Sequence, residues 1–382
     1  MPKRILFISN LFPNPLNPTM APYNRQQVVA LSDECEVEVI SPIPWPLLMK
    51  HPLKERVRSE GGVTVHHPTY YYLPGAFRNW HGDCFYLSIR KTASRLLETG
   101  AFDLIYSSWL YPDSWAAAKL AGEFGLPLYV KVHGSDVNRL TEGTSMTRRS
   151  LSVARTAQKI FCVSAALKER LAELGVPKER LEVIYNGIDR NIFFPGDKNE
   201  IRRLLRIQPD QYIVLYVGNL KKDKGVAELL HAFQAVLENG AAASPGLVLI
   251  GSGPYGKQAM ETVCALGLGG KVTFLGTQSL EAIALWMNAA SVLCLPSYME
   301  GVPNVVLEAL ACGTRVVATS VGGIPELVRG GSLTLVPPRS VPELVAALIE
   351  AAVQHEPMER VDLVQSWQEN ARSLLRQFDA AG

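Results

Sequence analysis

The sequence predicts an α/β protein made of two doubly wound domains in tandem, with a cleft between them. Short apolar runs, typical of buried parallel strands, alternate with helical stretches over residues 4–175, and the alternation restarts at residue 212. Between the two series, residues 183–200 (VIYNGIDRNIFFPGDKNE) contain Asn-Gly, Pro and mixed charge, which indicate a turn and a linker. A length of 382 residues also suits two domains.

The predicted strands follow one another in two sets. We place those of the first half at 4–9, 35–44, 62–68, 102–109, 126–134 and 159–165, and those of the second half at 212–218, 246–251, 271–276, 291–297 and 314–320. Because helices alternate with strands, each set should form a parallel sheet that is covered on both faces. Ligands of such sheets bind beyond the carboxyl ends of the strands, so the loops there are the candidate sites.

Composition excludes several classes of protein. The net charge is only +2, so no strong overall field selects nucleic acid or acidic surfaces. The six cysteines are scattered and several sit in apolar runs, which indicates buried thiols in a reducing compartment. The apolar run at the N-terminus is too short for the core of a signal peptide. No apolar run approaches the 18 residues that a membrane-spanning helix needs. We therefore expect a cytoplasmic protein.

Two glutamates bracket the start of a predicted helix in the second half, at residues 297–313. Pro303 suits the first helical position, and Gly313 suits a left-handed cap after the last turn. The amides at positions 304–306 would then be free to bind a phosphate. Glu308 lies about 7–8 Å along the axis, which is the distance from a diphosphate to the ribose hydroxyls of a nucleotide. Glu300, on the preceding loop, would face the group beyond the phosphates.

A structural alternative exists for both carboxylates. Glu300 could be a solvated loop residue, and Glu308 a surface position on an amphipathic helix. However, positions 305–307 and 309–311 around Glu308 are all apolar. A single glutamate on a helix that is apolar nearly all round is not a simple solvated face, and this favours a functional role.

The stretch EGVPNVVLEALACG (300–313) resembles the E-x7-E signature of the retaining glycosyltransferases of family 4, which have the GT-B fold. The resemblance extends over nearly the whole chain. It includes the "FP-x-P…RQ" opening, VHGSD, VIYNGID, YVGNLKKDKG, VGGIPE and SWQENA. It implies two Rossmann-like domains, at residues 1–190 for the acceptor and 191–362 for the nucleotide sugar. A C-terminal helix within 363–382 would pack back on the first domain.

The resemblance also implies roles for particular residues. Glu300 would hold hydroxyls of the donor sugar, Glu308 the ribose, Lys224 the diphosphate, and His133 the donor sugar near the reacting carbon. The remaining donor-binding positions that it implies are Asn219, Lys221, Gly301, Val302, Pro303, Asn304 and Val305. With a lysine and a helix start to stabilise the leaving diphosphate, no metal or cofactor is required, and the nucleoside-diphosphate sugar is a substrate.

Three departures or ambiguities accompany the resemblance. The family usually has an arginine where Asn219 stands, and Lys221 or Lys222 could supply that charge. The family commonly has a glycine near Met20 or Ala21, so either the register or the backbone contact differs here. Residues 251–256 (GSGPYG) match a dinucleotide fingerprint. The acid expected about 20 residues later is missing, so we interpret these glycines as a tight turn that lines the donor cleft.

His133 and Asp136 allow two interpretations each. A lone histidine is as often a structural residue as a functional one, and the resemblance favours the functional role. Asp136 could cap the following helix or orient the loop, and capping is the prediction.

Residues 44–95 mix aromatic residues with cations, so they could lie on an anionic membrane surface or could be an ordinary helix and loop.

For the function, we expect transfer of a hexosyl group with retention, without a metal, in cell-surface polysaccharide or glycolipid synthesis. The acceptor would be a glycan or a lipid-linked molecule, and the enzyme could contact the inner membrane surface. A nucleotide-sugar epimerase or hydrolase, or an inactive binding homologue, remains as an alternative.

Overall fold

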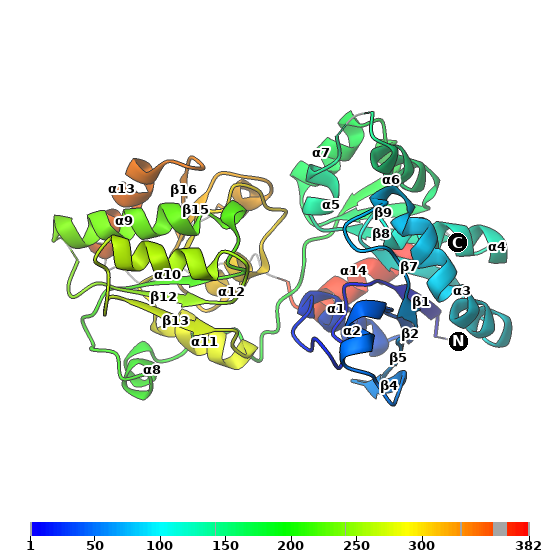
Figure 1. The fold of residues 1–382 in the computed structure, drawn as a ribbon, viewed down its shortest axis with the longest axis horizontal. Helices are drawn as coiled ribbons and strands as arrows, with labels where there is room; N and C mark the ends of the chain where they lie inside the picture. Colours follow the sequence, from blue (N-terminus) through cyan, green and yellow to red (C-terminus); the bar gives the residue numbers. More distant parts are fainter. Residues whose placement is uncertain (1, 142, 241, 329–330, 354–364, 381–382) are drawn as a thin grey trace. The chain divides into compact units, whose positions relative to one another are not determined.

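The structure is a computed structural model that describes residues 2–141, 143–240, 242–328, 331–353 and 365–380. The chain divides into two compact units (Figure 1). Unit 1 comprises residues 1–187 together with 367–382, and unit 2 comprises residues 188–366. Each unit is built around its own sheet with helices on both faces. The predicted class of two α/β domains is therefore confirmed.

Unit 1 contains an eight-stranded sheet in the order β10-β9-β8-β7-β1-β2-β5-β4. Its pairs are parallel except β4 with β5. A short separate pair, β3 with β6, lies outside this sheet. The strands are β1 Arg4–Ile8, β2 Glu36–Ile40, β3 Ile43–Pro44, β4 Val57–Glu60, β5 Val63–His66, β6 Thr69–Tyr70, β7 Leu104–Ser108, β8 Leu128–Val132, β9 Lys159–Cys162 and β10 Leu181–Val183.

The antiparallel strand β4 departs from the parallel sheet that the sequence predicts. Gly61 and Gly62 join β4 to β5 and have φ of 57° and 80°. Two successive residues with positive φ make the two-residue turn that suits a hairpin, which is why the chain reverses here. At the edge of the sheet, β4 carries Arg58 and Glu60, whose side chains pair at 2.7 Å.

Two layers of helices cover the faces of the unit 1 sheet. One core joins the sheet to α1 and α14, and the other joins it to helices that include α3, α4, α6 and α7. The helices of unit 1 are α1 Pro22–Ser32, α2 Trp45–Lys50, α3 His81–Thr99, α4 Asp113–Phe124, α5 Ser135–Asn138, α6 Ser145–Thr156, α7 Ala165–Glu173 and α14 Trp367–Asp379, with the 3-10 turns η1 Arg78–Trp80 and η2 Lys178–Arg180.

The C-terminal helix α14 belongs to unit 1, as predicted. It contacts α1, and its Phe378 ring lies 4.7–5.8 Å from the rings of Tyr106, Tyr129 and Phe161 on three central strands. These four aromatic side chains are almost fully buried. The last helix of the chain therefore completes the core of the first unit.

Unit 2 contains a six-stranded, fully parallel sheet in the order β13-β12-β11-β14-β15-β16. From β11 the chain adds β12 and β13 toward one edge of the sheet, and from β14 it adds β15 and β16 toward the other edge. The switch point of this sheet therefore lies between β11 and β14. The strands are β11 Ile213–Val217, β12 Gly246–Ile250, β13 Val272–Gly276, β14 Val292–Leu295, β15 Val316–Thr319 and β16 Leu333–Val336.

The helices of unit 2 form two groups. Helix α9 contacts α10 and α13, whereas α11 contacts α8 and α12, and Figure 1 shows the sheet between the α9–α10 pair and α11. The helices are α8 Lys198–Leu204, α9 Val226–Asn239, α10 Gly256–Ala265, α11 Leu280–Ala289, α12 Asn304–Ala311 and α13 Val341–Val353, with the 3-10 turns η3 Lys222–Lys224 and η4 Ile324–Leu327.

Candidate active site

The switch point of the unit 2 sheet brings Lys224 and Glu300 together. The loop after β11 carries Lys224, and the loop after β14 carries Glu300, 76 residues further along the chain. Lys224 Nζ lies 2.6 Å from Glu300 Oε1. Their side chains are 23% and 11% exposed, so the pair is largely shielded from bulk water. The amide of Tyr298 donates to the carbonyl of Asp223 (2.9 Å), which ties the two loops together beside the ion pair.

Two glycines let these loops approach at backbone distance. Gly225 follows Lys224 with φ of 68°, and a Cβ on it would lie 2.0 Å from the carbonyl oxygen of Pro296. Gly322 has φ of 55°, and a Cβ there would lie 2.1 Å from the carbonyl oxygen of Glu300. The neighbouring amide of Gly323 donates to the carbonyl of Gly301 (2.7 Å). The backbone that presents Glu300 is therefore held from both sides.

Helix α12 follows Glu300 and starts one residue later than the sequence predicts. Pro303 is the residue before the helix, with extended backbone, and Asn304 is the first helical residue. The amide of Val306 donates to the carbonyl of Pro303 (3.1 Å). Of the three amides expected to be free for a phosphate, that of Val306 is therefore used within the first turn. Gly313 has φ of 73° and is the predicted left-handed residue after the helix.

Glu308 occupies the middle of α12 among buried neighbours. Val306, Leu307, Ala309 and Leu310 are all buried, whereas Glu308 keeps partial contact with solvent. The protein around the carboxyl group removes most of its hydration, and this burial raises the pKa of Glu308 to about 7. A carboxyl group held in this way is poised between its neutral and ionised forms at physiological pH. The structure therefore contradicts the simple solvated-face interpretation.

The remaining donor-loop residues differ in exposure. Asn219 and Lys221 are exposed, and the carbonyl of Asn219 accepts from Tyr216 Oη and from the amide of Lys221, both at 2.9 Å. Gly301 and Val302 are buried, whereas Asn304 and Val305 are partly exposed at the start of α12. These positions lie at one edge of the same sheet as Lys224.

The GSGPYG segment packs against the donor loop. A Cβ on Gly253 would lie 2.3 Å from the carbonyl oxygen of Leu220, and one on Gly251 would lie 2.0 Å from that of Gly218. Leu220 donates to the carbonyl of Ser252 and accepts from the amide of Tyr255, each at 2.9 Å. The glycines therefore let two loops of unit 2 meet, which accounts for the motif without a dinucleotide.

His133 lies in unit 1, at the carboxyl end of β8, and is held by a chain of hydrogen bonds. Asn24 Nδ2 donates to the carbonyl of Leu11 (2.6 Å), so Asn24 Oδ1 faces Ser108, whose hydroxyl donates to it (3.0 Å). The contact of 2.8 Å between Ser108 Oγ and His133 Nε2 must then be donated by the imidazole. Burial, with a smaller contribution from nearby Lys131, lowers the pKa of His133 well below its usual value. His133 is therefore a neutral imidazole protonated on Nε2.

Asp136 does not cap the following helix, and the prediction of a cap is wrong. Its Oδ1 accepts from the amides of His133 (3.0 Å) and Gly134 (2.9 Å), and its Oδ2 accepts from the amide of Leu110 (3.2 Å). The side chain lies within α5 and points back at the loops after β7 and β8. Asp136 therefore joins these two loops and orients the backbone of His133.

Sequence reasoning missed Asp113, a fully buried acid near His133. Asp113 Oδ2 accepts from Ser9 Oγ and from the amide of Asn10, each at 3.3 Å. Its Oδ1 has no hydrogen-bond partner among the described residues. Burial raises the pKa of Asp113 well above its usual value, which favours the neutral form of the carboxyl group. The signal in the sequence is an acid directly after Pro112, shortly beyond the strand predicted at 102–109.

Ala21 lies in the N-terminal loop where the family commonly has a glycine. It has φ of 45° and ψ of 57°, which is the left-handed conformation that glycine adopts most easily. The backbone therefore keeps the shape of a glycine position, although an alanine occupies it.

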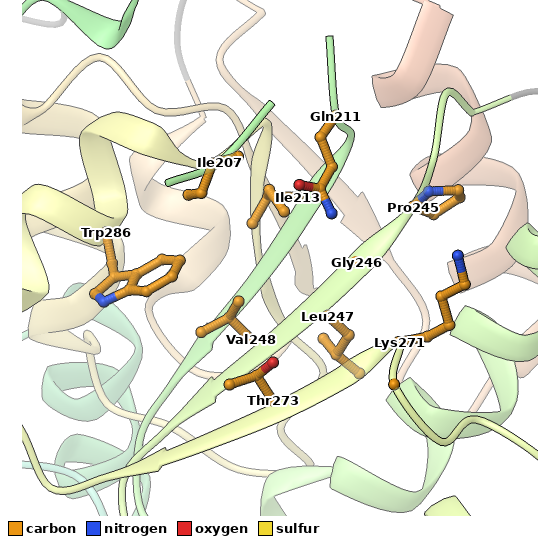
Figure 2. A pocket seen from close by; sticks show the side chains of 11 residues that line it. Ile207, Gln211, Ile213, Pro245, Gly246, Leu247, Val248, Lys271, Thr273 and Trp286 are labelled. Carbon is orange, nitrogen blue, oxygen red and sulfur yellow. The ribbon is translucent and has the colours of Figure 1, made fainter. Parts of the chain in front are cut away.

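A pocket of about 190 Å³ lies at the opposite edge of the unit 2 sheet (Figure 2). Figure 2 shows Trp286 of α11 beside Val248 and Thr273 on neighbouring strands, with Gln211 and Lys271 at the amino ends of β11 and β13. Because ligands of open α/β sheets bind at the carboxyl ends, this pocket is separate from the candidate site.

The described residues contain neither a metal-binding cluster nor a membrane-spanning helix. Within them, no group of three or more His, Cys, Asp or Glu side chains is arranged to hold a metal ion. No described helix is both long enough and apolar enough to cross a bilayer.

Two protein-family models match the chain. "Glycosyltransferase Family 4" matches residues 20–192, and "Glycosyl transferases group 1" matches residues 197–374. The chain is 29% identical to "Putative teichuronic acid biosynthesis glycosyltransferase TuaC" of Bacillus subtilis, over 99% of this chain and 95% of that protein. It is 32% identical to the D-inositol 3-phosphate glycosyltransferase of Mycobacterium ulcerans, over 66% of this chain and 56% of that protein.

Solved structures share the fold. Sucrose-phosphate synthase from Thermosynechococcus elongatus superposes with a TM-score of 0.80 at 22% identity, over the whole of both chains. Anabaena HepE in complex with UDP-glucose superposes with a TM-score of 0.70 at 20% identity, over 99% of this chain and 98% of that chain. Taken with the matched family models, these likenesses show that the chain belongs to glycosyltransferase family 4, a family of retaining enzymes with the GT-B fold that use nucleoside-diphosphate sugars as donors.

Proposed function

We propose that this protein transfers a hexosyl group from a nucleoside-diphosphate sugar to a hydroxyl acceptor, with retention and without a metal. The observation that carries the proposal is the Lys224–Glu300 pair, at 2.6 Å, beside the start of α12 at the switch point of the unit 2 sheet. The leaving group of such a reaction is a diphosphate whose negative charge grows as the bond breaks. A partly buried cation next to backbone amides is suited to stabilise that charge.

Each side chain of the site has a proposed task. Lys224 neutralises the diphosphate, and the backbone N–H groups of Gly301, Val302, Asn304 and Val305 surround it, since Pro303 has none to donate. Glu300 accepts hydrogen bonds from donor-sugar hydroxyls and keeps Lys224 oriented through their contact. Glu308 accepts from the ribose hydroxyls. Asn219 and Lys221 border the diphosphate, and Lys221 replaces the charge of the arginine that the family usually has at position 219.

His133 is assigned to the donor sugar near the reacting carbon. A neutral imidazole suits this task because it leaves the lone pair of Nδ1 to accept a hydroxyl proton, while Nε2 is engaged by Ser108. Asp136 supports this role by holding the amide of His133.

We propose that the acceptor is a glycan or a lipid-linked glycan in the synthesis of a cell-surface polysaccharide or glycolipid. The likeness to a protein named for teichuronic acid biosynthesis, over 99% of the chain, supports this pathway class. The enzyme would work on the cytoplasmic side, with the nucleotide sugar as a substrate and no separate cofactor, and would touch the inner membrane surface.

The test is a thermal-shift screen of the full chain against UDP-, GDP- and ADP-sugars, followed by transfer assays. The true donor should raise the free energy of unfolding by about 2.7 kcal/mol at 100 times its Kd. Release of nucleoside diphosphate should depend on added acceptor, and the product should keep the anomeric configuration of the donor. Acceptor-independent release would indicate a hydrolase, and a changed sugar on an intact nucleotide would indicate an epimerase.

Glu308→Ala provides the test of the site. We expect donor binding to weaken at least tenfold, while the control Glu261→Ala, an exposed acid on α10, leaves it unchanged. Unaltered donor binding by the Glu308 variant would remove the ribose role.

A further inference from the structure

The pocket of about 190 Å³ at the amino end of the unit 2 sheet takes no part in the proposed transfer (Figure 2). We refer to it as the edge pocket. Its volume is below the roughly 300–1,000 Å³ of sites for drug-sized ligands, so it suits one small ring with its substituents. Its lining includes Gln211, Gly246, Val248, Lys271, Thr273 and Trp286.

The edge pocket forms where the helices cover the sheet incompletely. Strand β13 is the outermost strand on its side, whereas α11 packs on the inner strand β11. Thr273 on β13 is exposed, although its neighbour in register on β12, Val248, is only 5% exposed. Gly246 leaves space for a second side chain, because a Cβ on it would lie 3.1 Å from Gln211 Nε2. The floor is therefore open, with the carboxamide of Gln211 above it.

Four polar side-chain groups of the edge pocket are available to a ligand. They are the carboxamide of Gln211, the ammonium group of Lys271, the hydroxyl of Thr273 and the indole N–H of Trp286. Within the part of the chain that the structure describes, none of these groups makes a hydrogen bond or a salt bridge. Together they offer N–H and O–H donors and two kinds of oxygen acceptor. The lining carries one positive charge, that of Lys271, and no carboxylate.

This combination of groups matches a sugar ring. A pyranose has an apolar C–H face, which packs on a flat aromatic side chain, and hydroxyls around its edge that both donate and accept. Figure 2 shows Trp286 at one end of the lining, next to Val248 and Thr273, and Lys271 at the other end. A lipid tail would leave the four polar groups without partners. A nucleoside diphosphate would bring more negative charge than a single lysine balances.

We infer that the edge pocket binds a segment of an anionic glycan. One pyranose ring lies on the indole of Trp286, its hydroxyls pair with Thr273 and Gln211, and a carboxylate of the same segment reaches Lys271. The pocket is at the amino ends of the strands, whereas the candidate active site is at the carboxyl ends, so a glycan held here leaves the donor site free. The inference goes beyond the proposed function and rests on it only for the source of the glycan, a growing polysaccharide.

The test is calorimetric titration of the full chain with two probes. One is a tetrasaccharide of alternating glucuronate and N-acetylglucosamine, and the other is a neutral tetrasaccharide of N-acetylglucosamine. We expect the anionic probe to bind about fivefold more tightly at low salt, and added salt to reduce this advantage. Trp286→Ala should weaken the binding of both probes at least tenfold, because the ring loses its aromatic face. Lys271→Gln should weaken only the anionic probe, about fivefold.

Matched variants separate the edge pocket from the rest of unit 2. Phe194→Ala and Lys257→Gln change exposed residues outside the pocket, so both should bind the probes as the parent chain does. Thr273→Tyr fills the pocket without removing a packed side chain, since Thr273 is exposed and tyrosine suits a strand. It should prevent binding of both probes and leave the melting curve by circular dichroism unchanged.

Three outcomes would overturn the inference. They are an absence of binding by the anionic tetrasaccharide, equal binding of the two probes by the parent chain, and binding that survives both Trp286→Ala and Thr273→Tyr. The last outcome would place the glycan at another site, such as the acceptor site of unit 1. If Trp286→Ala fails to fold, Thr273→Tyr decides. The titration needs no donor and the donor thermal shift needs no glycan, so this inference and the proposed function can fail separately.

Discussion

At the carboxyl edge of the unit 1 sheet, the ionisable side chains are buried and shifted toward their neutral forms, whereas the edge of unit 2 keeps an ion pair. In unit 1, burial raises the pKa of Asp113 and Asp136 and lowers those of His133 and Lys131. In unit 2, Lys224 and Glu300 retain partial exposure and face one another. An edge whose ionisable groups are shifted toward their neutral forms suits a neutral hydroxyl compound, and an edge with a partly exposed ion pair suits an anionic nucleotide. The contrast supports the proposal that unit 1 binds the acceptor and unit 2 binds the donor.

The largest effect that would test this contrast comes from Lys224→Met. We expect kcat/KM to fall about 10³-fold because the developing diphosphate charge loses its cation and Glu300 loses its partner. Steady-state kinetics with the identified donor provide the measurement. The control is Lys257→Met on α10, whose side chain is 89% exposed and which should keep full activity. Equal kinetics for the two variants would mean that the charge of Lys224 does not contribute to catalysis.

The buried lysine of unit 1, Lys131, should instead weaken the fold through its charge. It is 1% exposed, its Nζ lies 5.7 Å from the centre of the Trp367 ring, and burial lowers its pKa to about 7. Lys131→Met should raise the free energy of unfolding at pH 7 by about 1–3 kcal/mol, because a buried charge is replaced by an apolar chain of similar length.

The pH dependence of the free energy of unfolding provides a second test of Lys131. Between pH 7 and the usual lysine pKa, the unfolded chain binds more protons at this site than the folded chain. Stability of the parent chain should therefore rise with pH across that window, and Lys131→Met should remove this rise. Denaturant titrations of both proteins at several pH values measure it. A loss of stability at every pH in the variant would mean that the lysine charge contributes to the fold.

The glycines of unit 2 allow a matched comparison at the two ends of α9. Gly225 and Gly240 have nearly equal φ, 68° and 73°, but only Gly225 has backbone within reach of a Cβ. We expect Gly225→Ala to cost at least about 3 kcal/mol and Gly240→Ala about 1 kcal/mol, since the second substitution adds only left-handed strain. Thermal unfolding of the two variants gives the difference. Equal costs would show that the loop after β11 can move away from Pro296.

The last expected effect concerns the titration of Glu308. Its pKa of about 7 lies above that of a glutamate in an unfolded chain, so the folded chain binds more protons between roughly pH 4.5 and 7. Stability should therefore decline as pH rises through this window, by at most about 3 kcal/mol, and Glu308→Gln should flatten the decline. Donor affinity should improve over the same range, because the ionised carboxylate is the better acceptor for ribose hydroxyls. Parallel pH profiles of the parent and the variant would contradict both expectations.

Much of the fold follows from local sequence, because buried parallel strands are continuous apolar runs. The runs at 4–9, 102–109 and 212–218 each became a strand, and Gly313 ended its helix as predicted. Pro303 shows the limit of this reasoning: proline suits both the first helical residue and the residue before it, and the first turn of α12 decided between them. The antiparallel strand β4 was missed because its alternating polar pattern lacks an apolar run.

The sequence proposes the residues of the candidate site one by one, but it does not predict how they assemble. Lys224 and Glu300 are separated by 76 residues, and only the strand order of unit 2 brings them together. The joining role of Asp136 depends on the loop after β7, which comes earlier in the chain and gives no local signal. The raised pKa of Asp113 likewise arises from complete burial, a property of tertiary packing.

The return of the last helix has a consequence for synthesis of the chain. Phe378 fills the centre of unit 1, yet residues 188–366, all of unit 2, are made before it. At ordinary elongation rates of 5–20 residues per second, this leaves an interval of about 10–35 s in which the N-terminal sheet has emerged from the ribosome without α14. During that interval, the apolar face later covered by α14 stays open to chaperones. The half of the enzyme that is translated first is therefore the half that matures last.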